Sequence, residues 1–194
     1  MIREKGRPAE VRVADVGQSH TLERSVRQIE AILGPIDIAV AAAGINAWGN
    51  LDTLTPERLH QALSANLEGV ANLARLVVPG MKERGVGKLI VVASDAGRKP
   101  SAGGSGYTAT KWGAVGFALS LSRELLPAGV GVHVIEPGSV DTDWYLSNPN
   151  APRERMLSPQ DVALAIMFAA TLPANLVLEE LLLIPRRLEV EGWK

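Results

Sequence analysis

The feature that most constrains this fold is a regular alternation of largely apolar runs with helix-length amphipathic segments. The apolar runs lie at residues 36–44, 87–94, 131–138 and 176–184, and segments with helical patterns separate them. Runs that are apolar at nearly every position are typical of strands buried on both faces of a parallel sheet. We therefore predict an α/β fold with three α/β/α layers, in which helices cover both faces of the sheet.

Local signals place the remaining elements. Residues 9–16 alternate between apolar and polar side chains and predict a further strand, and residues 22–33 carry an apolar stripe at helical spacing. Thr55 followed by Pro56 predicts a helix start, and Ser158 with Asp161 fits a capping box. We expect helices over 56–84, over 105–127 and from 159 to about 171. No repeat or linker divides the chain, so we predict one domain over residues 1–194.

Composition excludes several classes of function. The chain has a formal net charge of −1, so we expect neither nucleic acid nor an anionic membrane as a partner. It contains no cysteine, its N-terminal segment is charged, and no window reaches the roughly 18 apolar residues of a spanning helix. We therefore expect a cytoplasmic protein. His20, His60 and His133 have no ligand spacing, so we expect no metal site.

Tyr107 and Lys111 stand four residues apart, near the start of the helix predicted over 105–127. They therefore share one face, and an ammonium beside a phenol lowers the pKa of the tyrosine from about 10 toward a value useful for acid/base catalysis. The same spacing also fits an ordinary pair on a helix surface. Ser94 favours the catalytic interpretation, because it ends the preceding predicted strand and its hydroxyl could reach the same reacting oxygen.

Three segments together resemble the short-chain dehydrogenase/reductase family: IVVASDAG (90–97), YTATK (107–111) and IEPGSVDT (135–142). The resemblance covers essentially the whole chain. It implies a Rossmann-like, doubly wound sheet and hydride transfer between NAD or NADP and a small alcohol or ketone. It also implies a homodimer or homotetramer that packs through the helices at 56–84 and 105–127.

The resemblance assigns roles to individual residues. Tyr107 resembles the acid/base, Ser94 the partner that orients the substrate oxygen, and Lys111 the residue that lowers the tyrosine pKa and contacts the nicotinamide ribose. Asn66 resembles a residue that holds a water in the proton relay. The expected cofactor contacts further include Asp15, Val16, Ala41, Ala43, Gly44, Pro137, Gly138, Val140 and Thr142. Trp144 and Tyr145 stand where the family has a substrate lid, and simple packing is the alternative for both.

The chain departs from the family pattern at its start. It begins after the family's first strand, glycine-rich turn and second strand, and neither Thr-Gly-x-x-x-Gly-x-Gly nor Gly-x-Gly-x-x-Gly occurs in it. We therefore expect an N-terminally truncated fold that lacks the first βαβ unit, with the strand at 9–16 separated from its usual neighbours. The sequence AAAG (41–44) also replaces Asn-Asn-Ala-Gly, and for Ala41–Ala43 we expect a tightly packed strand end.

Two interpretations of the start remain open. Either Met1 is an internal methionine of a longer enzyme, or the chain is short and its dinucleotide binding is weakened or lost. Two functions from different classes follow. The first is an NAD(P)-dependent oxidoreductase, which the joint presence of Ser94, Tyr107, Lys111 and Asn66 favours. The second is a non-catalytic homologue that binds a partner, which the absent phosphate turn and the expected exposed apolar surface favour.

Overall fold

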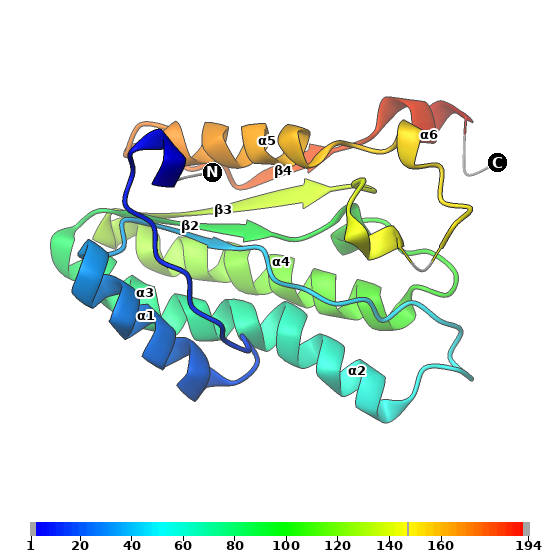
Figure 1. Ribbon diagram of the computed structural model, residues 1–194, viewed down its shortest axis with the longest axis horizontal. Coiled ribbons are helices and arrows are strands. Elements are labelled where there is room, and N and C mark those ends of the chain that lie inside the picture. The colour runs from blue at the N-terminus through cyan, green and yellow to red at the C-terminus, as the bar shows by residue number, and fades with distance from the viewer. Residues whose placement is uncertain (1–2, 147, 192–194) are drawn as a thin grey trace.

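The computed structural model describes residues 3–146 and 148–191. Its sheet has four parallel strands, which follow one another across the sheet in chain order: β1 (Ile38–Ala41), β2 (Gly87–Val92), β3 (Val130–Pro137) and β4 (Glu180–Leu183). The register places Val91 of β2 beside Ala41 on one side and Val134 on the other. The predicted α/β class and parallel sheet are thus confirmed (Figure 1).

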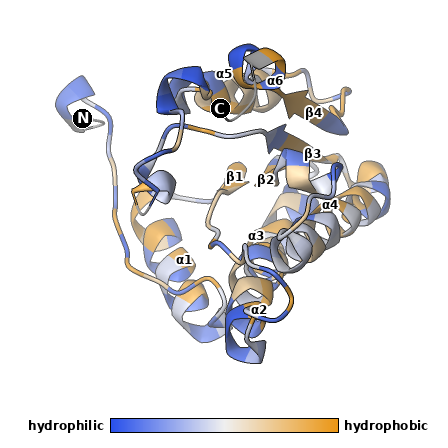
Figure 2. Ribbon diagram, turned by 90° about the vertical axis from the view of Figure 1, so that its right-hand side faces the viewer, coloured by the Kyte–Doolittle hydropathy of each residue, from blue (hydrophilic) through white to orange (hydrophobic). Residues whose placement is uncertain are grey.

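Helices cover both faces of this sheet. One face carries α3 (Gly69–Arg84) and α4 (Ser105–Leu125), with α1 (Ser19–Leu33) packed against α3 and α2 (Pro56–Leu63) leading into α3. The other face carries α5 (Pro159–Thr171), and α6 (Arg186–Glu191) follows β4. Figure 2 shows the sheet between these two groups of helices, which gives the three expected layers.

The alternation of side chains along β2 explains why both faces need cover. Leu89 and Val91 are buried in the core between the sheet and α3 and α4. Ile90 points the other way and packs with Ile135 of β3 and Ala165 of α5. The apolar residues of β2 are therefore withdrawn from water on both sides of the sheet, and the continuous apolar run at 87–94 follows from this arrangement.

Short polar signals fix the helix ends that lead toward the carboxyl edge of the sheet. Thr55 caps α2 by accepting a hydrogen bond from the Arg58 backbone N–H at 3.2 Å. Ser158 and Asp161 form the predicted capping box at the start of α5. The predicted helix over 56–84 is interrupted by a π-helical turn, Ser64–Glu68, between α2 and α3. Such turns often mark functional sites, and this one carries Asn66.

The strand predicted at residues 9–16 is not formed. The chain from residue 7 to residue 15 has no regular secondary structure, and Val11 and Val13 are 79% and 97% exposed. An alternating pattern stabilises a strand only when a neighbouring strand supplies backbone partners, and β1 is the last strand of the described sheet on that side. The segment reaches α1 as an irregular connection (Figure 1).

Among the exposed apolar side chains of the described residues, two groups stand together. One lies on the outer side of β1, with Ile38 and Val40, and the other lies on the outer side of α5, with Leu164, Met167 and Phe168. Within residues 3–146 and 148–191, no helix combines the length and the apolar content that crossing a bilayer requires.

Substitution of Val13 tests the correction at residues 9–16. We expect Val13→Ser to change the free energy of unfolding by less than about 0.5 kcal/mol, because the side chain is already in water. The matched change Val132→Ser in β3, where the side chain is 1% exposed, should cost about 2 kcal/mol or more. Urea denaturation measures both, and comparable losses at the two positions would contradict the assignment.

Candidate active site

The carboxyl ends of β1, β2 and β3 open onto one pocket of about 370 Å³. Its walls come from the segments that follow these strands and from the first turns of α4, as expected at the edge of an open parallel sheet. The pocket brings together the following residues that the sequence analysis singled out: Gly44, Ser94, Tyr107, Lys111, Pro137, Gly138, Val140, Thr142, Trp144 and Tyr145.

Tyr107 lies in the first turn of α4 between two tryptophans, and 9% of its surface is exposed. Its ring stacks on Trp48 with 6.0 Å between centroids and meets Trp144 edge-on at 5.7 Å. Burial raises the pKa of Tyr107 to about 12, although a hydrogen bond with Ser94 acts to lower it. The expected lowering of this pKa is therefore wrong for the structure, because withdrawing the phenolate from water outweighs the influence of its neighbours.

Lys111 follows one helical turn later and is 5% exposed. Its Nζ donates a hydrogen bond to the Val92 carbonyl at 3.2 Å and lies 5.7 Å from the centre of the Tyr107 ring. Burial lowers the pKa of Lys111 to about 8. At neutral pH Lys111 is therefore protonated in most molecules, and its charge lies in the wall of the pocket beside the phenol.

Ser94 follows β2 and begins the short turn Asp95–Gly97. Its Oγ accepts a hydrogen bond from the Ala96 N–H at 3.2 Å and donates one to Asp95 Oδ1 at 3.1 Å. The hydroxyl is 8% exposed and bonds with Tyr107, so it is held at one wall of the pocket. Its place at the end of a buried strand, which the sequence predicted, sets this position.

Asn66 does not line the pocket but holds its parts together. In the π-helical turn its Oδ1 accepts a hydrogen bond from the Ile45 N–H at 2.7 Å, and its Nδ2 donates to the Ile45 carbonyl at 3.0 Å. Nδ2 also donates to Thr110 Oγ1 at 2.9 Å, and Thr110 in turn donates to the Tyr107 carbonyl at 2.8 Å. One buried amide thus links the loop after β1 to the helix that carries Tyr107. The sequence analysis missed Thr110.

The other predicted cofactor contacts lie outside this pocket. Asp15 Oδ1 accepts a hydrogen bond from the Gly17 N–H at 2.9 Å, and the Val16 carbonyl accepts one from Asn72 at 2.9 Å. Ala41 is buried in the core, whereas Ala42 and Ala43 are exposed. The packed strand end expected for Ala41–Ala43 is therefore wrong for the last two residues, because the strand ends at Ala41.

Trp48 is a second residue that the sequence analysis missed. It lies in the loop after β1, where Asn46 Oδ1 accepts a hydrogen bond from its backbone N–H at 2.7 Å. A side chain at Gly104 would place its Cβ 2.6 Å from Trp48, at the edge of the six-membered ring, so that glycine lets this edge approach the start of α4. A large aromatic residue in a turn-rich loop just after a buried strand was the available signal.

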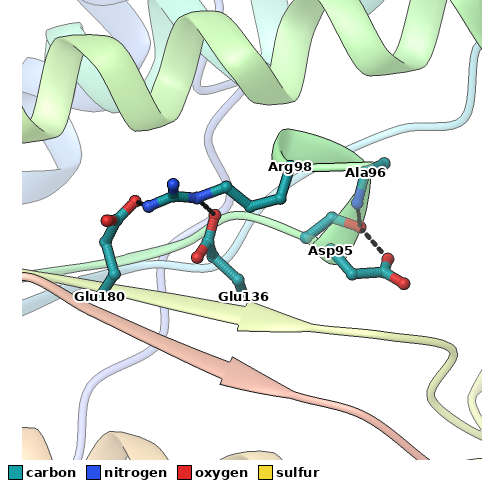
Figure 3. Close-up of polar contacts among 6 residues, drawn as sticks. Asp95, Ala96, Arg98, Glu136 and Glu180 are labelled. Carbon is teal, nitrogen blue, oxygen red and sulfur yellow. Dashed lines mark hydrogen bonds and ion pairs between the residues drawn. The ribbon is translucent and has the colours of Figure 1, made fainter. Parts of the chain in front are cut away.

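Arg98 anchors the turn after Ser94 to the sheet. Its Nε contacts Oε1 of Glu136 at 3.2 Å, and its Nη2 pairs with Glu180 at the start of β4. Glu136 is 1% exposed, so burial raises its pKa while Arg98 lowers it. Figure 3 shows Arg98 reaching toward both glutamates while the carboxylate of Asp95 points the other way. The turn is thereby held in place by charges that lie outside the pocket.

Comparison with known proteins identifies the family. The short chain dehydrogenase family matches residues 1–151. The chain belongs to the short-chain dehydrogenase/reductase family. Acetoacetyl-CoA reductase of Allochromatium vinosum is 35% identical over 166 residues, which are 81% of this chain and 68% of that protein. This chain is by class an NAD(P)-dependent oxidoreductase.

Solved structures of the same family agree with the fold. An alcohol dehydrogenase from the archaeon Thermococcus sibiricus, complexed with 5-hydroxy-NADP, superposes with a TM-score of 0.85 at 30% identity and covers 94% of this chain and 77% of its own. Serine dehydrogenase from Escherichia coli gives a TM-score of 0.75 at 32% identity, and the match covers 88% of this chain and 73% of that enzyme. The doubly wound, Rossmann-like architecture is thus shared with these enzymes.

The pocket residues leave open space and polar groups that suit part of a dinucleotide cofactor. A Cβ at Gly44 would lie 3.1 Å from Asn66 Oδ1 and 3.7 Å from Lys111 Nζ, so the absence of a side chain keeps space open beside these polar groups. Lys111 and Thr142 supply donors to the same space. The glycine-rich phosphate turn does not occur in the sequence given.

The lowered pKa of Lys111 predicts a rise in stability between about pH 8 and pH 10. In this window the unfolded lysine, with its ordinary pKa of 10.5, keeps a proton that the folded lysine, with a pKa of about 8, has released. The unfolded state then binds more protons, so the free energy of unfolding increases with pH.

Urea denaturation at about pH 7.5 and about pH 9.5 measures this rise. We expect the wild type to gain on the order of 1–2 kcal/mol between the two conditions and Lys111→Met to lack that gain. An equal gain in both proteins would assign the effect to other groups.

Proposed function

We propose that this chain transfers hydride between NAD(P)(H) and a small alcohol or carbonyl compound, with Tyr107 as the acid/base. The observation that carries the proposal is the pocket wall on which the phenol of Tyr107 and the hydroxyl of Ser94 are hydrogen-bonded beside the buried ammonium of Lys111. A proton donor and a second hydrogen-bond donor thus lie together where one substrate oxygen could meet both.

The ionisation of the site favours proton donation by the tyrosine. With a pKa of about 12, Tyr107 is a neutral phenol at physiological pH. In the reductive direction it gives this proton to the oxygen of the substrate, while Ser94 turns its hydroxyl proton from Asp95 Oδ1 to the same oxygen. Lys111, charged and in the same wall, stabilises the phenolate that results. In the oxidative direction the same groups accept the proton of the alcohol.

The bound dinucleotide would supply or accept the hydride, and the chain would position it. We infer that Lys111 holds the nicotinamide ribose and that Gly44, Pro137–Gly138, Val140 and Thr142 surround the nicotinamide. Asn66 acts on the site through Ile45 and Thr110, and its role in holding a relay water remains a prediction. Asp15 and Val16 are predicted to lie beside the adenine, outside the 370 Å³ pocket.

Three further expectations belong to this proposal. The substrate is a small molecule, and the lid positions Trp144 and Tyr145 contact it. The chain forms a homodimer or homotetramer through the helices at 56–84, which are α2 and α3, and through α4. It works in the cytoplasm, and the choice between NAD and NADP depends on charges that the family carries after its first glycine-rich turn.

The substitution Tyr107→Phe tests the acid/base assignment. It removes one hydroxyl and keeps the ring between Trp48 and Trp144, so we expect turnover to fall by at least about 100-fold. Turnover is measured as the rate at which NADH or NADPH is oxidised in the presence of each ketone in a panel of short ketones. The dissociation constant of the cofactor and the circular dichroism spectrum should stay unchanged.

The control outcomes separate the two functions that the sequence left open. Equal turnover in wild type and Tyr107→Phe would remove the tyrosine from the mechanism. A wild type that neither turns over any ketone nor binds either cofactor would favour a protein that acts by binding a partner.

A further inference from the structure

A second hollow of about 620 Å³ adjoins the pocket of Tyr107 on its substrate side. The two share the wall formed by Trp48, Asp95 and Trp144, and Tyr145 lines both. The proposed function uses the first pocket and leaves the second without a ligand. A substrate whose oxygen meets Tyr107 and Ser94 would extend its remaining atoms into this second space.

Aromatic rings dominate the shared wall. Trp48 and Trp144 lie on either side of the Tyr107 ring, with centroids 6.0 Å and 5.7 Å from it, and Tyr145 lies next to Trp144 in the chain. Indole and phenol rings carry negative charge density on their faces and attract cations within about 6 Å of the ring centre. These walls therefore suit a positively charged ligand that also has apolar groups to pack against the rings.

Asp95 gives the hollow a negative charge. Its Oδ1 accepts the hydrogen bond of Ser94, and its Oδ2 lies 3.5 Å from the position that a Cβ on Gly138 would take. Among the described residues, no lysine or arginine forms an ion pair with Asp95. Arg98 turns away toward Glu136 and Glu180 (Figure 3).

Lys99, the cation among the described residues that line the hollow, lowers the pKa of Asp95, but Glu189 acts in the opposite direction. Lys99 Nζ forms an ion pair with Glu189 Oε1 at 3.2 Å. The two charges of that pair offset one another, so Asp95 leaves the space with a surplus negative charge. Burial raises the pKa of Asp95, which means that its charged form is costly at this place, and a cation supplied by a ligand would reduce that cost.

We propose that the hollow binds the ammonium group of a short amino alcohol or of the matching amino carbonyl compound, with Asp95 as the counter-charge and Trp48 and Trp144 as walls. This proposal rests on the proposed function for its chemistry, and it names the substrate class. In the oxidative direction the carbinol carbon loses a hydride to the oxidised nicotinamide, and the hydroxyl loses its proton to Tyr107. The ammonium group is unchanged.

The spacing of the groups limits the length of the substrate. In this structure the single hydroxyl proton of Ser94 is donated to Asp95 Oδ1. In the proposed complex the hydroxyl turns that proton to the reacting oxygen, and the ammonium takes its place beside Asp95. An ammonium that pairs with Asp95 while the oxygen meets Ser94 must therefore be close to the reacting carbon. Short amino alcohols meet this condition, whereas long-chain amines would place the charge beyond Asp95.

Direct binding of two probes of matched shape, without cofactor, tests the proposal. Choline carries a trimethylammonium group, and 3,3-dimethylbutan-1-ol has a neutral carbon in place of its nitrogen. We expect the wild type to bind choline about tenfold more tightly than the neutral alcohol, as measured by isothermal titration calorimetry. Asp95→Asn keeps an acceptor for Ser94 and removes the charge, so it should reduce this preference to about twofold or less.

Glu124→Gln is the matched control, because it removes one negative charge from the exposed far end of α4. It should keep the full preference for choline. Equal binding of the two probes by wild type, failure to bind either, or a preference that survives in Asp95→Asn would each overturn the ammonium site. A wild type that prefers choline yet shows no turnover would leave the site standing and would refute the proposed function instead.

Discussion

The site depends on one buried amide, the side chain of Asn66. It satisfies both backbone groups of Ile45 and one hydroxyl of Thr110, and Thr110 reaches the backbone of Tyr107. Buried polar groups are costly unless they are paired, so this set of four hydrogen bonds is stable only when the loop after β1, the π-helical turn and α4 take up one arrangement. The pocket is preorganised by that requirement, with Gly44 open beside Lys111.

The pKa values in the site are set by burial more than by charged or hydrogen-bonded neighbours. Tyr107 and Lys111 are both withdrawn from water, and burial moves their pKa values apart, to about 12 and about 8. Both shifts favour the neutral form. Tyr107 therefore keeps its proton at neutral pH. Its pKa would fall when polar groups of a ligand enter the pocket and stabilise the phenolate.

The sequence predicted the elements whose signals lie within a few neighbouring residues. The buried strands, the caps at Thr55 and Ser158, and the convergence of Ser94, Tyr107 and Lys111 at one edge all follow from patterns within a few residues. The segment at 9–16 failed because its strand needs a neighbour that no local pattern can supply. Trp48, Thr110 and the pairing of Arg98 with Glu136 and Glu180 escaped notice because contacts between distant segments create them.

The ring arrangement around Tyr107 gives the protein a built-in optical reporter. The sequence has four tryptophans, and two of them, Trp48 and Trp144, line both the pocket and the hollow. Trp112 is 52% exposed on the outer side of α4, away from these spaces. A molecule that enters between the rings changes the surroundings of two indoles at once, so occupancy of the site becomes visible as intrinsic fluorescence without a label.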